Sequence, residues 1–301
     1  MQLPKLDRFL LGDNPFIGVD HLSQERARER QTRLNSFRIC EVINTAIANG
    51  AEGLLFTTHP IIYDALNELK KQPDMSNLGL YPLLPYAHAY VQMATEKGIV
   101  GLFRSILSSL SWKSRAKAVI NGGLSLASMD PERALHAYVE TELELLSKNA
   151  PKQALLKCVL LHEVITDLSI SFGASDLLMA FANQIMDEYH VRPGFVTRNF
   201  SRFVAFASRS NLPLDRIVIV TPFNGAGFQM NPSREACEQT LSRLSAGHVI
   251  AMSILAAGFL KLNDAVRYLN KHPRINSFVV GASTNEHAKE TFSNLRSMLD
   301  G

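Results

Sequence analysis

The chain has 301 residues, of which 46% are hydrophobic and 20% are charged, and its formal net charge is +3. This composition can fill a large core, which excludes a disordered chain, and the nearly balanced charge disfavours a nucleic-acid partner. The first residues show no apolar stretch behind a basic start, and no window holds the roughly 18 consecutive apolar residues that a membrane span needs. We therefore expect a cytoplasmic protein with no membrane partner.

The cysteines stand far apart in the sequence, at Cys40, Cys158 and Cys237, and none belongs to a CxxC pair. This spacing supports neither a disulfide framework nor a thiolate zinc site. We expect reduced thiols that are mostly buried.

Short runs rich in Val, Ile, Leu and Phe alternate with segments of helical periodicity along the whole chain. The predicted strands cover residues 8–12, 53–57, 80–86, 156–162, 194–199, 216–224, 248–255 and 276–281. Alternating strands and helices indicate a parallel sheet covered by helices, and eight strands close a (β/α)8 barrel. We therefore predict an α/β fold, a TIM barrel, as a single domain over residues 1–301.

The third predicted strand is followed by an unusually long connection before the next helix. A loop in this position is normally several times shorter, so we predict a helical insertion over about residues 90–130. Its apolar stripe, with Lys113, Arg115 and Lys117, favours packing on the barrel or on a second subunit over contact with a membrane. The insertion could serve as a lid over a substrate or as a homodimer contact.

In a barrel of this kind, the residues that do chemistry come from the carboxyl ends of the strands. The sequence places a polar ring there, whereas the opposite strand ends show little beyond turn residues. The ring comprises Asp13, Asn14, Thr57, Thr58, His59, Tyr86, His88, His162, Glu163, Thr197, Arg198, Asn199, Thr221, Asn224, Ser253, Gly281 and Ser283. A small-molecule substrate would contact Asn14, Tyr86, His88, Thr197 and Asn224.

Histidines follow three neighbouring strands, at His59, His88 and His162. With Glu163, and with Asp13 further round the ring, they form a set of nitrogen and oxygen donors that suits a divalent metal. After the last strand, Gly281 would allow a ligand to approach the backbone, and the helix near Thr284 would offer free N–H groups to a phosphate. A capped turn without a ligand explains the same residues.

Several motifs resemble those of the aldo-keto reductases. VIAMSILAAGFL (residues 249–260) resembles the family's seventh strand and pyrophosphate loop, FVVGASTNEHAKETFSNL its eighth strand and helix, and GFVTRNF its fifth strand. LLKCVLLHE is similar to the fourth strand, which would make His162 the histidine of the catalytic tetrad. The resemblance implies NADP or NAD as cofactor. The implied cofactor-binding residues are Asn199, Ser253, Leu255, Gly258, Gly281 and Ser283.

The chain departs from the family at the other tetrad positions. The aspartate falls on Thr57 or Thr58, depending on the register, and Tyr63 matches the tyrosine only in the second register. The lysine that would lower the pKa of the tyrosine is missing from the third strand. Val220 replaces the glutamine that contacts the nicotinamide ring. His59 is the alternative acid, because imidazole titrates near neutral pH without a cation beside it.

These observations leave three functions open. The first is an oxidoreductase for a small carbonyl or alcohol, with Tyr63 or His59 as the acid beside His162. The second is a lyase, isomerase or hydrolase without nicotinamide that uses the histidine-rich rim, with or without a metal bound by His59, His88, His162 and Glu163. The third is a non-catalytic binding protein that kept the barrel.

Overall fold

The computed structural model describes residues 3–18, 35–72, 78–85 and 131–299. Within this part of the chain, parallel strands close into a barrel, because β2 pairs with β3 as well as with β1. The strands are β1 (Phe9–Gly12), β2 (Gly53–Thr57), β3 (Gly79–Leu84), β4 (Leu155–Leu156), β5 (Cys158–Leu161), β6 (Arg192–Val196), β7 (Val218–Pro222), β8 (His248–Met252) and β9 (Ser277–Gly281). Since β4 and β5 both pair with β3 and only Lys157 separates them, they are halves of one strand position. The predicted (β/α)8 barrel is confirmed.

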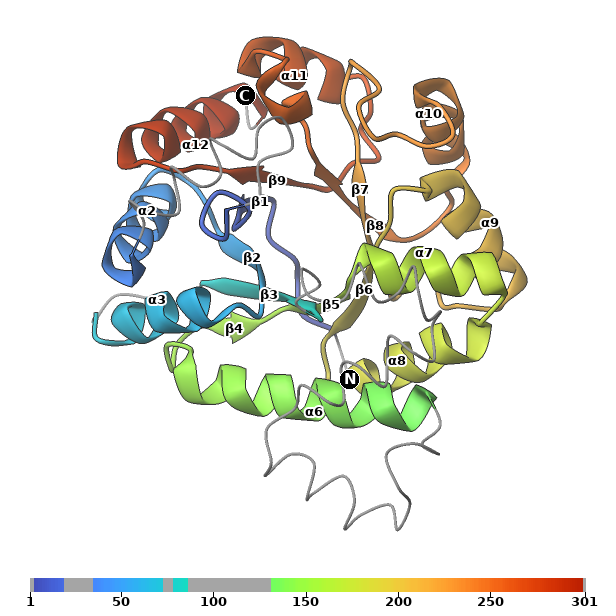
Figure 1. Ribbon diagram of the computed structural model, residues 1–301. Helices are drawn as coiled ribbons and strands as arrows, with labels where there is room; N and C mark the ends of the chain where they lie inside the picture. The colour runs from blue at the N-terminus through green and yellow to red at the C-terminus, as the bar shows by residue number, and fades with distance from the viewer. Residues whose placement is uncertain (1–2, 19–34, 73–77, 86–130, 300–301) are drawn as a thin grey trace.

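Helices surround the barrel, and Figure 1 shows them as a ring outside the strands. They are α2 (Ser36–Ala48), α3 (Pro60–Lys70), α6 (Pro131–Asn149), α7 (Glu163–Phe172), α8 (Ser175–Glu188), α9 (Phe200–Arg209), α10 (Arg234–Arg243), α11 (Leu262–Leu269) and α12 (Asn285–Leu299), with a 3-10 turn η2 (Ala256–Gly258). The predicted insertion over 90–130 lies outside the described residues, as do Tyr86 and His88.

Alternation along the strands separates two apolar cores. Leu10, Leu55, Tyr81, Leu160 and Val220 belong to a small cluster inside the barrel, whereas their strand neighbours pack outward against the helices in a much larger cluster. Both faces of each strand are therefore buried, which explains why the strands appear in the sequence as continuous apolar runs.

The strand predictions place each element correctly and err mainly at the carboxyl ends. The predicted run 194–199 corresponds to β6 (Arg192–Val196), and 216–224 corresponds to β7 (Val218–Pro222). In both cases the pairing ends where polar residues begin, at Thr197 and after Pro222. The residues beyond these points are the ones that carry the candidate site.

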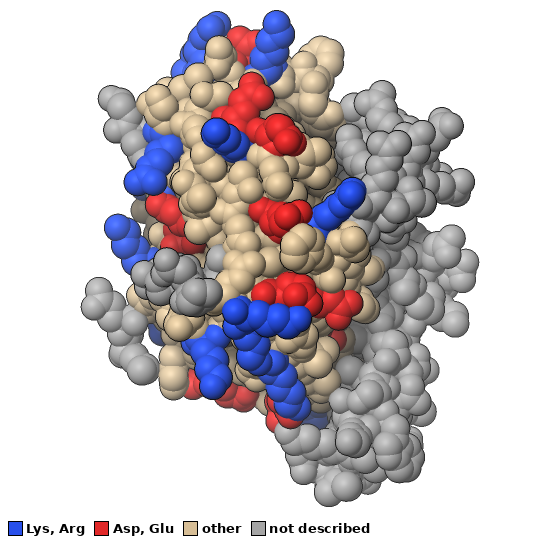
Figure 2. All heavy atoms as spheres, turned by 90° about the vertical axis from the view of Figure 1, so that its left-hand side faces the viewer, with Lys and Arg blue, Asp and Glu red and all other residues tan. Residues whose placement is uncertain are grey.

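Several predicted surface and core features can be compared with the structure. Cys40, Cys158 and Cys237 are buried and free, as predicted. No helix in the described ranges is long and apolar enough to cross a membrane. Figure 2 shows acidic and basic side chains intermixed on the face that carries α12, α2 and α3.

Candidate active site

Asp13 is a buried carboxyl at the carboxyl end of β1. It is 3% exposed, and its Oδ2 accepts hydrogen bonds from the backbone N–H and the hydroxyl of Thr57, both at 2.7 Å. Burial raises the pKa of Asp13 to about 6, although the bonds from Thr57 lower it. Among the described residues, no charged group contributes to this shift.

The position of Thr57 shows where the Asp13 carboxyl lies in the barrel. In the β2–β3 register, Thr57 is paired with Leu83 and Leu55 with Tyr81. Leu55, Tyr81 and Leu83 all belong to the interior cluster, and residues paired in register point to the same face of a sheet. Thr57 therefore points into the barrel, and its hydroxyl bond places the Asp13 carboxyl at the inner rim of the carboxyl end.

His59 and His162 have the same local geometry. Each is the N-cap of the helix that follows, and each Nδ1 accepts from a backbone N–H, that of Ile61 at 3.1 Å for His59 and that of Val164 at 3.2 Å for His162. A nitrogen that accepts a hydrogen bond carries no proton, so the cap requires a neutral ring with its hydrogen on Nε2. Both rings are therefore hydrogen-bond donors at Nε2.

Tyr63 lies on α3, in the layer between the barrel and its helices. Its hydroxyl donates to Oε2 of Glu142 on α6 at 2.9 Å. Burial and the neighbouring Glu142 carboxylate both raise the pKa of Tyr63. The shift is opposite to the one that prepares a phenol for proton transfer near neutral pH.

Asp167 on α7 collects three groups from the segment after β6. It accepts from the Thr197 hydroxyl at 2.5 Å, from the Arg198 N–H at 3.3 Å and from the Asn199 side-chain amide at 3.0 Å. Burial raises the pKa of Asp167, and these bonds lower it. Thr197 and Asn199 are thus turned toward α7, a contact that spacing alone could not predict.

Glu163, proposed above as an alternative metal ligand, forms an ion pair with Arg198. Within the described ranges, no group of three or more His, Cys, Asp or Glu side chains could hold a metal ion. The predicted set also contains His88, which lies outside those ranges. Glu163 is therefore engaged by a cation, and His59 and His162 by helix caps.

Two other predicted substrate contacts, Asn14 and Asn224, differ in their exposure to solvent. Asn14 is exposed just after β1. Asn224 is fully buried, and its side chain exchanges two hydrogen bonds with the backbone of Phe228, at 2.8 and 2.9 Å. Asn224 therefore closes the loop after β7 on itself.

The loop after β8 has an unusual backbone. Ser253, Ala256 and Ala257 have φ angles of 53°, 48° and 59°, and Gly258 follows at 89°. Such left-handed conformations are unfavourable for residues other than glycine and concentrate at functional sites. Leu255 accepts from the N–H groups of Gly258 and Leu260, so the loop forms a tight coil. It presents Phe259, which is 79% exposed.

The segment after β9 gives Gly281 a packing role. A Cβ atom at Gly281 would lie 2.8 Å from the ring of Pro15, so the glycine is needed for close packing there. Ser283 is partly exposed before α12, and the Thr284 hydroxyl caps this helix by accepting from the His287 N–H at 3.2 Å. These residues therefore form a capped turn.

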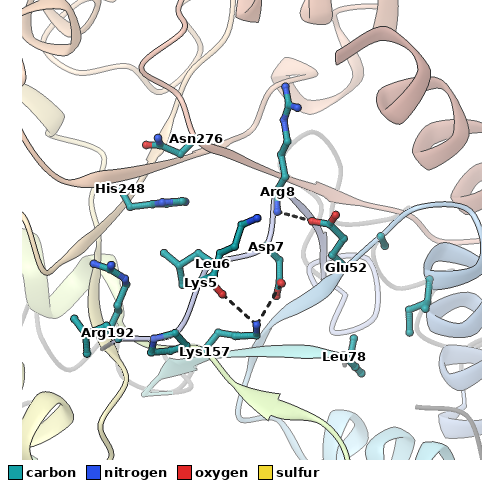
Figure 3. A pocket seen from close by; sticks show the side chains of 14 residues that line it. Lys5, Leu6, Asp7, Arg8, Glu52, Leu78, Lys157, Arg192, His248 and Asn276 are labelled. Atoms are coloured by element: carbon teal, nitrogen blue, oxygen red, sulfur yellow. Dashed lines mark hydrogen bonds and ion pairs between the residues drawn. The ribbon is translucent and has the colours of Figure 1, made fainter. Parts of the chain in front are cut away.

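The amino end of the barrel is more polar than the sequence suggested. A cavity of about 1020 Å³ opens there, and charged residues line it, including Lys5, Asp7, Arg8, Glu52, Lys157 and Arg192. Figure 3 shows Lys157 reaching the Asp7 carboxylate, at 3.7 Å, and the Lys5 carbonyl, at 3.1 Å. The prediction of mere turn residues was wrong, because these charges come from the starts of different strands and only the fold gathers them.

Asp7 links several strands at this end of the barrel. Its carboxylate accepts from the Tyr81 hydroxyl at 3.0 Å, and Gly79 and Gly53 leave room for it, since a Cβ at Gly79 would overlap it. The backbone carbonyl of Asp7 accepts from the Ser277 hydroxyl at 2.6 Å, and His248 contacts that hydroxyl at 2.7 Å. These contacts connect the starts of β1, β3, β8 and β9 beside the cavity, beneath the interior cluster.

Comparisons with known proteins support the fold. No protein-family model and no curated protein matches the sequence. The chain is similar to two solved structures of candidate aldo-keto reductases from Pseudomonas aeruginosa, each with 12% sequence identity and a TM-score of 0.60 over 97% of this chain and 90% of the other. The resemblance predicted from the sequence is thus confirmed at the level of the fold: the chain is built on the same barrel as these candidate aldo-keto reductases.

Proposed function

We propose that the protein is an oxidoreductase that interconverts a small carbonyl compound and its alcohol with a nicotinamide cofactor, NADP or NAD. The observation that carries this proposal is the state of His162 at the end of β5. Its cap bond fixes the neutral ring with the hydrogen on Nε2. A neutral imidazole donor can hydrogen-bond a carbonyl oxygen and polarise it without giving up a proton.

The residues after β8, β9 and β6 fit the cofactor. The loop after β8 is tightly coiled, with left-handed backbone at Ser253, Ala256, Ala257 and Gly258, and Ser253, Leu255 and Gly258 would line the pyrophosphate there. Ser283, next to the start of α12, would lie near the adenosine phosphate. Asp167 fixes the Asn199 side chain through its NH2 group, which orients the amide oxygen for a carboxamide. When bound, the cofactor supplies or accepts the hydride.

Neither of the two predicted acids, Tyr63 and His59, is well suited to donate the proton. Tyr63 donates to Glu142, and its pKa is raised. His59 is held neutral by its own cap, and a neutral imidazole is a weak acid. The described residues thus support His162 as the group that orients the carbonyl and leave proton transfer to a further group.

The predicted substrate-contacting residues have different places in this proposal. Asn14 is exposed at the carboxyl end, whereas Thr197 and Asn224 support the loops around it through Asp167 and Phe228. No contact among the described residues favours a metal-dependent or nicotinamide-free reaction, so we propose no second function.

Titration of the purified protein with NADPH and NADH tests the proposal. Nicotinamide fluorescence and calorimetry measure the binding. We expect micromolar affinity for at least one of them and turnover of small aldehydes or ketones. His162→Gln should retain cofactor affinity and reduce turnover by about 100-fold. Val164→Ala, a change to the residue whose N–H His162 accepts, keeps that N–H and serves as the control. Absence of binding at millimolar cofactor would contradict the proposal.

A further inference from the structure

We propose that Asp13 is the proton donor, and in the reverse direction the proton acceptor, of the reaction at the carboxyl end of the barrel. This inference rests on the proposed function. It assigns catalysis to the residue directly after β1, which the resemblance does not implicate. In the aligned motif, the position that carries the tetrad aspartate is occupied by Thr57 or Thr58.

The position of the carboxyl carries the inference. Thr57 points into the barrel beside Leu83, and Asp13 bonds both the hydroxyl and the N–H of Thr57. A carboxyl is therefore present at the inner rim of the mouth, next to the end of β2, although it comes from the neighbouring strand. His162 directly follows β5, which pairs with β3, so Asp13 and His162 lie on either side of the ends of β2 and β3.

The surroundings suit an acid that must be neutral before it acts. Asp13 is 3% exposed, and its donors are the uncharged groups of Thr57. Burial without a cation raises its pKa to about 6, so about a tenth of the Asp13 carboxyls carry a proton at pH 7, and a larger share at lower pH. After proton loss, the two bonds from Thr57 stabilise the carboxylate that forms.

The proton balance of the step is simple. As the carbonyl carbon gains a hydride, the π electron pair of the C=O bond moves to the oxygen. That pair forms an O–H bond with the Asp13 proton, and the electrons of the Asp13 O–H bond stay on the carboxylate. Alcohol oxidation runs the same transfers in reverse, with the Asp13 carboxylate taking the hydroxyl proton.

Asp13→Asn is a nearly isosteric test. Both Thr57 donors bond the same oxygen, Oδ2, so an asparagine carbonyl in that place can accept both. The variant should fold, bind nicotinamide as the wild type does, and lose about 100-fold or more in carbonyl reduction. The wild-type reduction rate should fall as pH rises through about 6, and this limb should be absent from the variant.

A stability measurement gives a readout that does not depend on turnover. The wild-type carboxyl must ionise in a buried place, so the melting temperature of Asp13→Asn should exceed that of the wild type by a few degrees at pH 8 and match it at pH 4. Asp7→Asn, the same change at the opposite end, is the control and should leave the pH limb of reduction in place. A carboxylate needed only for structure would make Asp13→Asn less stable than the wild type at pH 8.

Thr57 would act as a positioning residue. Its hydroxyl lowers the pKa of Asp13, so Thr57→Val should move the limb of reduction to higher pH, whereas Thr57→Ser should restore it. If nicotinamide binds and Asp13→Asn reduces carbonyls at the wild-type rate with the same pH profile, the role of Asp13 is wrong and the proposed function stands. If nicotinamide does not bind, the proposed function fails, and the catalytic role of Asp13 fails with it.

Discussion

Each end of the barrel holds an aspartate, partly buried at Asp7 and fully buried at Asp13, and the two carboxyls differ in their partners. Asp7 at the amino end lies 3.7 Å from the Lys157 amine and also accepts from the Tyr81 hydroxyl. Asp13 at the carboxyl end accepts from the neutral groups of Thr57. Burial raises the pKa of both, but Lys157 lowers that of Asp7, and no cation in the described chain lowers that of Asp13. Lys157 thus offsets part of the burial cost of the Asp7 carboxylate, whereas only neutral hydrogen bonds offset that of Asp13.

The two ends also respond to pH with opposite signs. Asp13 has a folded pKa of about 6, above its usual 3.8, so the stability linked to it is lost as pH rises through about 6. His248 at the amino end has its pKa lowered from 6.5 to about 4, by burial and then by Arg192, so its contribution is lost as pH falls from about 6.5 to 4. The two transitions cover nearly the same pH range, so the two contributions to stability offset each other there.

The largest effect is expected from breaking the ion pair at the amino end. Lys157→Met removes the cation that offsets the burial of Asp7, and we expect a loss of about 2–4 kcal/mol in the free energy of unfolding. The loss should grow as pH rises through the pKa of Asp7, because the unpaired carboxylate is then charged. Urea unfolding at pH 4 and pH 8 measures it. Lys148→Met, which removes an exposed pair with Glu144, is the control and should cost less than about 1 kcal/mol.

A smaller effect is expected at His248. Its Nε2 contacts the Ser277 hydroxyl, which itself donates to the Asp7 carbonyl, so Nε2 carries the hydrogen. His248→Gln can keep this donor and cannot be protonated. In the wild type, we expect His248 to lower the free energy of unfolding by up to about 3 kcal/mol as pH falls from about 6.5 to about 4. In His248→Gln this decrease should be absent, and stability at pH 8 should be nearly unchanged. The pH dependence of urea midpoints tests this, and an unaltered acid limb would show that His248 does not control it.

The contrast between the ends also explains what the sequence could predict. Strand positions and the barrel followed from apolar runs, because both faces of a parallel strand are buried and leave a continuous pattern. The residues of the polar ring followed from the same strand assignment, because they are the residues at which the predicted strands end. Asp13 appeared in that ring without a signal to set it apart from Asn14 or Thr58.

Contacts between elements could not be predicted in this way. Tyr63 matched a family position, but its hydroxyl is directed by Glu142, which is 79 residues away in the sequence. Asn199 likewise depends on Asp167, which looked like an ordinary helix residue. At the amino end, Asp7 and Lys157 are 150 positions apart, and only the closure of the barrel makes them a pair. Spacing within one element carries no information on such pairs.

The smallest expected effect concerns backbone strain, which also differs between the ends. At the amino end, a left-handed residue such as Asn211 stands alone after a helix, where asparagine tolerates it, whereas Ala256 and Ala257 are consecutive at the carboxyl end. Ala257→Gly should relieve about 1 kcal/mol of strain and lose part of it to chain entropy, for a net gain of about 0.5 kcal/mol.

The same substitution at Ala174, the N-cap of α8 with a φ of −79°, is the control and should change stability by at most about 0.5 kcal/mol, because no strain is relieved there and an N-cap accepts glycine. Measuring the cofactor affinity of both variants tests whether the loop after β8 binds the cofactor. If the coiled loop is held in its strained form to bind a pyrophosphate, Ala257→Gly should gain stability and weaken NADPH binding several-fold, and Ala174→Gly should leave binding unchanged. Equal affinity in both variants would mean that the loop geometry serves the fold and does not hold the cofactor.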